Sequence, residues 1–160
     1  MQIELADVER VIPLRHAVLR AGLPAELARF EGDDAPGALH LAAVEQGEVV
    51  GCVTCMPSED EGAPAWRLRG MAVADGWRDR GVGSALLEAV ERELCQRPGP
   101  RRMWCNARVP AVRFYEERGW RSVTEPFDIP TAGPHRKMTR TLECGSLRKQ
   151  GPWIDADEHG

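Results

Sequence analysis

A short glycine-bearing segment between a predicted strand and a predicted helix carries residues suited to binding an anion. It reads Arg78-Asp79-Arg80-Gly81-Val82-Gly83-Ser84. Two glycines let the backbone turn tightly and approach a ligand closely. The free amides and the dipole of a helix that begins here favour a negative group such as a pyrophosphate. The segment therefore predicts an anion site, and the alternative is a tight turn that binds nothing.

Two common nucleotide-binding motifs do not fit this segment. A Rossmann fingerprint requires a third glycine, and Leu86 stands in its place. A Walker loop requires Gly-Lys followed by Ser or Thr, which is absent from the segment. A phosphate-bearing ligand would therefore be held in another way.

A second segment, residues 106–120, reads Asn-Ala-Arg-Val-Pro-Ala-Val-Arg-Phe-Tyr-Glu-Glu-Arg-Gly-Trp and contains the only tyrosine of the chain. Pro110 is well placed to begin a helix and Gly119 to follow its end. Ala111 lies four residues before Tyr115, so the two share a helix face. A Phe-Tyr pair on a helix is most often core packing, whereas a positioned phenol can also donate a proton in catalysis.

Together the two segments resemble the GNAT-type N-acetyltransferases. The pattern Arg78-x-x-Gly81-x-Gly83, after a strand ending Met71-Ala72-Val73, is similar to the acyl-CoA-binding signature of that family. Residues 106–120 are similar to the family's N-x-x-x-x-A-x-x-F-Y-x-x-x-G-[FW] segment. The two patterns occur in the family's order, and the resemblance covers about residues 3–142.

The resemblance implies roles for the residues of both segments. Backbone groups of Met71 and Val73, with Ala72 between them, would pair with the pantetheine amides as an added strand. Arg78 or Arg80 would add charge at the pyrophosphate, and Asn106 would bond the pantetheine arm. Tyr115 would protonate the leaving thiolate. The pyrophosphate would be held by backbone amides of Asp79, Arg80, Gly81, Val82, Gly83 and Ser84. The co-substrate would be acetyl-CoA, and no metal is implied.

The base that would deprotonate the acceptor amine is indicated less sharply. By default each candidate is a surface or capping residue; the candidates are His16, Asp33, Asp34, His40 and His135. In the family, the loop after the first helix and the last hairpin border the acceptor pocket, so the resemblance favours His40 and His135. Histidine also titrates near neutrality. A relay through water, without a dedicated base, is the alternative.

Two arginines on the first predicted helix, Arg15 and Arg20, have two interpretations. By default they lie on a solvated helix face. The alternative is contact with an acidic acceptor.

Hydrophobic periodicity predicts an α/β (α+β) fold. Helices are expected over about 6–20, after the glycine turn at 75–83, and from Pro110, with Asp7 as an N-cap and Pro13 kinking or dividing the first helix. Residues 29–37, 57–64 and 126–134 are expected to be loops. The predicted strands are 3–5, 39–44, 49–56, 66–73, 103–106, 120–124 and 136–142.

A strand–helix–strand unit at 66–106 implies one parallel pair in a mixed, mainly antiparallel sheet of about seven strands. The resemblance implies that this pair splays apart to form the acyl-CoA cleft. Residues 1–142 would form the acetyltransferase domain and 143–160 a polar C-terminal tail.

Composition excludes several classes of protein. The chain has 160 residues and a formal net charge of −4, which disfavours sequence-independent binding to nucleic acid or an anionic membrane. It contains no run of about 18 apolar residues and no secretory leader pattern, so no membrane association is expected.

Cysteine usage points to a reducing compartment. The count of five cysteines is odd, which predicts free thiols and a cytoplasmic location. Cys52 and Cys55 form a C-x-x-C pattern within a predicted strand, where residues three apart face opposite sides. We therefore expect buried structural thiols rather than a metal or redox pair.

The resemblance thus implies acetyl transfer from acetyl-CoA to a primary amine of a small molecule or peptide, by direct attack in a ternary complex. Cys105, beside Asn106, is the first suspect for a covalent route. A non-catalytic acyl-CoA-binding or sensing protein on the same fold is one alternative, and a dinucleotide-binding module is another. A homodimer is left open. The loops at 24–38, 57–65 and 126–134, which would shape the acceptor pocket, carry no signature that names the acceptor.

Overall fold

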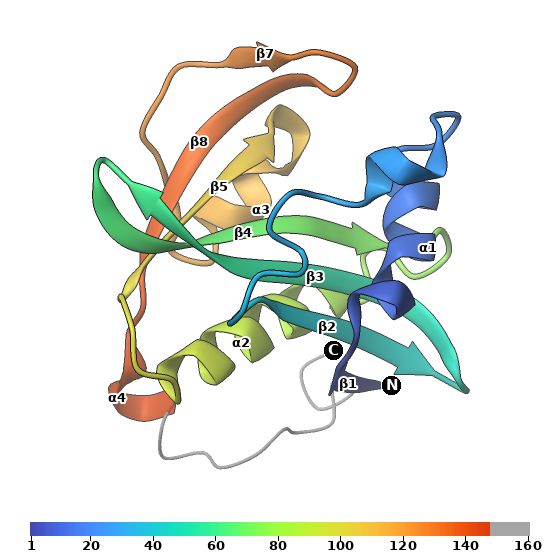
Figure 1. Cartoon of the computed structure of the whole chain (residues 1–160), viewed down its shortest axis with the longest axis horizontal. Helices are drawn as coiled ribbons and strands as arrows, with labels where there is room; N and C mark the ends of the chain where they lie inside the picture. The colour runs from blue at the N-terminus through green and yellow to red at the C-terminus, as the bar shows by residue number, and fades with distance from the viewer. Residues whose placement is uncertain (148–160) are drawn as a thin grey trace.

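The computed structural model describes residues 1–147 (Figure 1). Its elements in chain order are β1 (Gln2–Leu5), α1 (Val8–Leu19), the 3-10 helix η1 (Ala25–Ala28), β2 (Leu39–Glu45), β3 (Glu48–Asp60), β4 (Ala63–Val73), α2 (Val82–Cys95), β5 (Arg102–Arg108), the 3-10 helix η2 (Val109–Ala111), α3 (Val112–Glu116), β6 (Arg121–Ser122), β7 (Phe127–Ile129), β8 (Gly133–Thr141) and α4 (Cys144–Leu147).

The strands of the described residues form one eight-stranded sheet in the order β1-β2-β3-β4-β5-β8-β6, with β7 paired to β8. Each pairing is antiparallel except that of β4 with β5, which is parallel. In Figure 1, β7 and β8 lie at one end of the sheet and β1 and β2 at the other. The mixed, mainly antiparallel sheet confirms the predicted fold class, with the short strand β7 as an addition inside the expected loop at 126–134.

Two hydrophobic clusters show that α1 and α2 cover opposite faces of the sheet. Val11 of α1 packs with Ala42, Cys52 and Ala72. The larger cluster joins α2 to the other face and includes Cys55. Cys52 and Cys55 therefore face opposite sides, as the C-x-x-C spacing on a strand predicts.

The parallel pair β4 and β5 splays apart, as expected. The ladder between these two described strands contains only Trp66 with Met103 and Arg67 with Trp104. A β-bulge lies just beyond, because Cys52 pairs with Ala72 and Thr54 with Arg69. Two residues, Gly70 and Met71, thus stand opposite one residue of β3, and Gly70 has a φ of +69° that suits glycine. The bulge redirects β4 where the strands separate.

Local structure differs from the sequence prediction in the expected loop at 57–64 and at Pro13. The expected loop at 57–64 is mostly strand, because β3 and β4 form a long hairpin that turns at residues 61–62. The first helix runs through Pro13 undivided, with Val11 and Arg15 buried on its packed face. Asp7 is the N-cap residue of that helix, as predicted, although its side chain makes no capping hydrogen bond. Packing of the helix face outweighs the cost of the proline.

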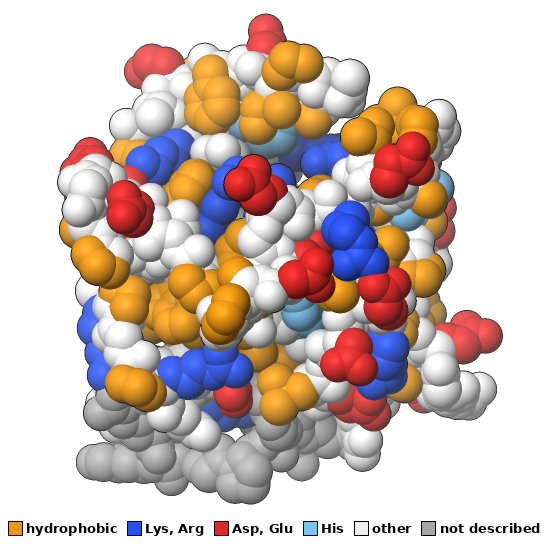
Figure 2. All heavy atoms as spheres, in the orientation of Figure 1, with side chains coloured by type: hydrophobic (Ala, Val, Ile, Leu, Met, Phe, Trp, Pro, Cys, Tyr) orange, Lys and Arg blue, Asp and Glu red, His pale blue; other side chains and the backbone are white. Residues whose placement is uncertain are grey.

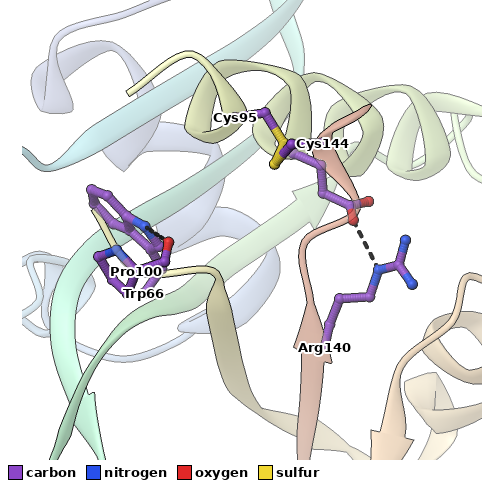
Figure 3. The surroundings of a disulfide bond; sticks show 6 residues. Trp66, Cys95, Pro100, Arg140 and Cys144 are labelled. Carbon is purple, nitrogen blue, oxygen red and sulfur yellow. Dashed lines mark hydrogen bonds and ion pairs between the residues drawn. A yellow bond between two sulfur atoms is a disulfide. The ribbon is translucent and has the colours of Figure 1, made fainter. Parts of the chain in front are cut away.

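The prediction of free thiols is wrong for two cysteines, because Cys95 and Cys144 form a disulfide (Figure 3). They are 49 residues apart in sequence and meet because β8 returns the chain past the end of α2. Cys52, Cys55 and Cys105 are free and buried. The compartment therefore stays a prediction.

The expected tail at 143–160 begins with the anchored helix α4, and residues 148–160 lie outside the described part of the chain. Within residues 1–147, no helix is long and apolar enough to cross a membrane.

Candidate active site

A cavity of about 650 Å³, here the loop cavity, lies over the glycine-bearing segment. It is lined by nearly all of the predicted cofactor-binding residues: Met71, Ala72, Val73, Arg78, Asp79, Gly81, Val82, Gly83 and Ser84. Arg80 lies outside this lining and instead places its guanidinium 4.1 Å from the centre of the Trp77 ring. Arg78 is exposed and its Nε donates to the carbonyl of Val73 at 3.4 Å.

The start of α2 leaves several amide groups available to a ligand in this cavity. Gly81 is the N-cap with a φ of +82°, and the first helical hydrogen bond runs from the Ala85 amide to the Gly81 carbonyl at 3.0 Å. The amides of residues 82–84 therefore have no helical acceptor. Close packing holds this helix end, since a Cβ on Gly51 of β3 would lie 2.5 Å from Cγ1 of Val82. The arrangement presents fixed amides and a helix dipole to an anion.

A second cavity of about 300 Å³, here the acceptor cavity, lies where β4 and β5 separate. Asn106, Tyr115 and His135 line it together. Met71, Ala111 and Phe114 line both cavities, so the two adjoin at these residues. The structure thus brings three predicted site residues together in a cavity that adjoins the loop cavity.

Tyr115 is held by aromatic packing with its hydroxyl unbonded. Its side chain is buried and contacts the rings of Phe114 and Trp120 edge-on, at centroid distances of 5.2 and 5.5 Å. Among residues 1–147 the hydroxyl has no hydrogen-bond partner. Burial raises the pKa of Tyr115 because a phenolate would be poorly solvated there. The side chain is thus a protonated phenol at the edge of a cavity.

His135 presents one nitrogen for chemistry. Its Nδ1 donates to the carbonyl of Gly133 at 2.7 Å, because a carbonyl oxygen can only accept. The ring also stacks on Phe127, with centroids 6.4 Å apart. In this tautomer Nε2 carries the lone pair, so a neutral His135 can accept a proton at that atom.

His40 lies elsewhere, in a network that uses both of its nitrogens. Its Nε2 donates to the carbonyl of Asp33 at 2.9 Å, and its Nδ1 pairs with Thr54 Oγ1 at 2.7 Å. The hydroxyl of Thr54 in turn accepts from Arg15 Nη2 at 2.7 Å. His40 is not among the residues that line the acceptor cavity. The structure therefore separates the two histidines that the sequence ranked together.

The expectation of a solvated face for Arg15 is wrong. Its side chain is fully buried and forms an ion pair with Asp33, with Nη1 and Oδ2 2.7 Å apart. Of the remaining candidate bases, Asp34 is exposed and 3.6 Å from Arg29, and His16 donates to the carbonyl of Leu23 at 2.7 Å.

Cys105 also lines the acceptor cavity but is poorly suited to nucleophilic attack. Burial raises the pKa of its thiol to about 12. The reactive form of cysteine is the thiolate, which is scarce at neutral pH when the pKa is so high.

Sequence reasoning missed a group of arginines in the acceptor cavity: Arg67, Arg69 and Arg108, which join Arg20 there. Figure 2 shows Lys and Arg side chains beside a histidine in the hollow between the β7–β8 end of the sheet and the α1 region. The signal was present in Arg67-x-Arg69, because residues two apart on a strand share a face. Of the three loops expected to shape the pocket, 24–38 contributes Phe30 and 126–134 contributes Ile129 and Ala132 to the lining.

Residues 9–120 match the model of the acetyltransferase (GNAT) family. The chain belongs to the GNAT family. Acyltransferase activity and the use of acyl-CoA follow from this membership. The splayed strands β4 and β5 and the adjoining loop cavity are consistent with it.

Individual proteins similar to this chain are also acetyltransferases by name or similar in fold. The uncharacterized N-acetyltransferase YitI of Bacillus subtilis is 34% identical over 145 residues, which cover 89% of this chain and 97% of YitI. The Escherichia coli ElaA structure is similar in fold, with a TM-score of 0.74, 16% identity, and coverage of 88% of this chain and 99% of that one. An aminoglycoside 6'-N-acetyltransferase in complex with coenzyme A has a TM-score of 0.69 and 19% identity, covering 89% and 98%.

Proposed function

We propose that this GNAT protein transfers the acetyl group of acetyl-CoA to a primary amine, by direct attack in a ternary complex. The observation that carries the proposal is the meeting of the two cavities at Met71, Ala111 and Phe114. A cofactor that fills the loop cavity would place its thioester at this junction. An amine in the acceptor cavity would then reach the same carbon.

The chain has groups suited to the pyrophosphate and to the pantetheine arm of the cofactor. The pyrophosphate would accept from the free amides of residues 82–84, with Arg78 nearby in the same lining. The pantetheine would extend along the edge of β4 at Met71 and Val73, which β5 leaves unpaired after Arg67 in the described sheet. Asn106 would bond this arm from the facing strand.

Two side chains would move the protons. The amine nitrogen attacks the thioester carbonyl and forms a tetrahedral intermediate, and its proton passes to His135 Nε2 directly or through water. When the carbon–sulfur bond breaks, the sulfur takes the hydroxyl proton of Tyr115 and leaves as the thiol of coenzyme A. The proton held by His135 would then return to Tyr115 through water, so both side chains are restored and the products are the N-acetylated amine and coenzyme A.

The test is thiol release from acetyl-CoA with polyamines, amino acids, aminoglycosides and peptides, with mass spectrometry of the acceptor. We expect release to depend on an amine and the product to gain one acetyl group. Initial-velocity plots should intersect, as for a ternary complex. A protein that binds acetyl-CoA but releases thiol no faster with any amine would be an acyl-CoA-binding protein instead.

A further inference from the structure

The acceptor cavity is strongly cationic. Four arginine side chains line it: Arg20 follows α1, Arg67 and Arg69 lie on β4, and Arg108 ends β5. Asp and Glu side chains are absent from the described lining residues. A cavity that binds a polycation would be expected to be lined by acidic side chains.

None of these four arginines forms an ion pair with a described residue. Arg67 stacks 4.5 Å from the Trp104 ring centre, and its Nε is buried without a hydrogen-bond partner in that part of the chain. Arg69 and Arg20 stack on the ring of Phe30 at 4.2 and 5.1 Å. Arg20 and Arg108 each donate to the carbonyl of Leu19, at 3.0 and 3.2 Å, and to no other acceptor in residues 1–147. Their positive charges are positioned but not neutralised.

Two buried acids, Asp33 and Asp60, already form ion pairs with arginines outside the lining of the cavity. Asp33 accepts from Arg15 Nη1 and Nη2, at 2.7 and 3.1 Å, and from the Phe30 amide at 2.7 Å. Arg102 at the other end of β5 is paired with Asp60. The chain thus pairs Arg15 and Arg102 with acids and leaves the four arginines that line the cavity without a counter-charge among the described residues.

The arginines of the cavity are also close to one another and partly buried, which makes their positive charge more costly. Burial, together with the charges of Arg67 and Arg15, lowers the pKa of Arg69 to about 10. Like charges that are partly removed from water repel one another. An anion bound among them would relieve that repulsion. The cofactor does not need these groups for its pyrophosphate, because the loop cavity has its own arginines, Arg78 and Arg118.

We infer, on the basis of the proposed function, that the acceptor is a small primary amine that carries carboxylate or phosphate groups. Its anionic end would bind Arg20, Arg67, Arg69 and Arg108, and its amine would face the junction at Met71 and Ala111. Guanidinium groups match both carboxylate and phosphate geometry. A volume of about 300 Å³ suits a molecule of amino-acid size.

The same arginines would assist the chemistry. Attack requires the neutral amine, and nearby positive charge disfavours the protonated form. An acceptor held among these side chains would therefore lose its ammonium proton more readily than in water. Anion recognition and amine activation would come from one set of residues.

The experiment compares matched amines that differ in charge. Aspartate is paired with asparagine, and O-phosphoethanolamine with ethanolamine; spermidine and kanamycin serve as cations. Binding to the protein loaded with coenzyme A and acetylation from acetyl-CoA are both measured. We expect at least one anionic amine to bind and react at least ~10-fold better than its uncharged partner, about 1.4 kcal/mol, and the two pairs separate carboxylate from phosphate recognition.

Substitution of single arginines tests whether the cavity is the site that binds the anionic group. Arg69→Gln and Arg20→Gln should each raise KM for the anionic amine about 10-fold and leave acetyl-CoA affinity nearly unchanged. Arg10→Gln removes an exposed arginine from outside the cavity and should change neither value. Two positions on different elements guard against a folding defect in one.

The outcomes separate this inference from the proposed function. Acetylation of cationic or uncharged amines in preference to both anions would overturn the inference and leave acetyl transfer standing. Equal selectivity in wild type, Arg69→Gln and Arg20→Gln would also overturn it. Coenzyme A binding without binding or acetylation of any amine in the panel would overturn the proposed function, and the inference with it.

Discussion

Gly83 of α2 lies directly against the ring of Phe114 in α3, so that a Cβ at residue 83 would approach Cζ of Phe114 to 3.2 Å. The sequence suggested that Gly83 leaves room for a phosphate. The structure shows that it also leaves room for an aromatic ring that lines both cavities. Two residues 31 positions apart in the chain are thereby packed against each other.

Gly83→Val should displace Phe114 and narrow the loop cavity. We expect the affinity for coenzyme A, measured by calorimetry on the folded variant, to fall about 10-fold or more, about 1.4 kcal/mol. Gly145→Val is the matched control, because a Cβ there meets nothing within 4 Å. Unchanged coenzyme A binding in Gly83→Val would remove this contact from the account.

Replacement of His135 by Gln should change the pH dependence of kcat/KM. If Nε2 accepts the amine proton, activity falls on acidification as the imidazole becomes protonated, and this limb should flatten in the variant. His40→Gln should instead lower the melting temperature and keep the limb, since His40 bonds Asp33 and Thr54 within the fold. An unaltered profile in His135→Gln would favour a water relay.

Features of this structure that are determined by residues close together in the sequence were predictable, whereas features determined by distant contacts were not. The glycine turn at 78–84 is set by neighbouring residues and precedes α2 as expected. The helix expected from Pro110 is instead the 3-10 helix η2, which holds Ala111, followed by the short α3, which holds Tyr115; the two residues still line one cavity. Pro57 and Pro64 suggested a loop, yet both lie in strands. In the described sheet, the pairing of β2 with β3 ends at Cys55, so Pro57 lies where β3 has an outer edge on that side.

Other features depend on contacts between distant segments and could not be read from spacing. His40 lies near the start of β2 and His135 near the start of β8, but only tertiary packing decides that one meets Thr54 and the other lines a cavity. The pairing of Cys95 with Cys144 likewise depends on the path of β8. The bulge at Gly70 had a local sign, a glycine within a strand, which the sequence interpretation passed over.

The disulfide should stabilise the fold. Cys144→Ser opens a bridge between residues 49 apart, for which the chain-entropy model gives about 4 kcal/mol. We expect a lower melting temperature than for wild type, and the same shift when wild type is reduced. Cys52→Ser is not a suitable control, since it buries a hydroxyl; Cys144→Ser under reducing conditions serves instead and should show no further shift. An unchanged melting temperature in Cys144→Ser would contradict the bridge.

Asp60 should make stability depend on pH in the acid range. It is buried at the end of β3, and the hydrogen bond from Lys137, with help from Arg102, holds the pKa of its carboxyl below the usual value. Because the folded pKa is depressed, this stabilisation is complete above the unfolded value of about 3.9 and is lost as pH falls through the folded pKa.

The melting temperatures of wild type and Asp60→Asn should therefore differ most above about pH 4 and converge below it. A difference that stays constant down to about pH 2 would show that the ion pairs of Asp60 do not stabilise the fold.

The proposed role of Tyr115 as the proton donor rests on its place in the acceptor cavity, beside the junction residue Phe114, and on its protonation. Burial raises the pKa of its hydroxyl, so the phenol keeps its proton across the usual assay range and should produce no basic limb of its own. Tyr115→Phe keeps the ring and its contacts with Phe114 and Trp120. The variant should therefore fold and bind acetyl-CoA as wild type does.

The most direct measurement is single-turnover acetyl transfer by Tyr115→Phe beside equilibrium binding of acetyl-CoA to the same protein. General acid catalysis is typically worth ~10²–10⁴-fold, so we expect the rate of the chemical step to fall by about that factor while the Kd for acetyl-CoA is nearly intact. A rate within about 3-fold of wild type would contradict the account, because the sulfur would then take its proton from solvent and Tyr115 would be a packing residue alone.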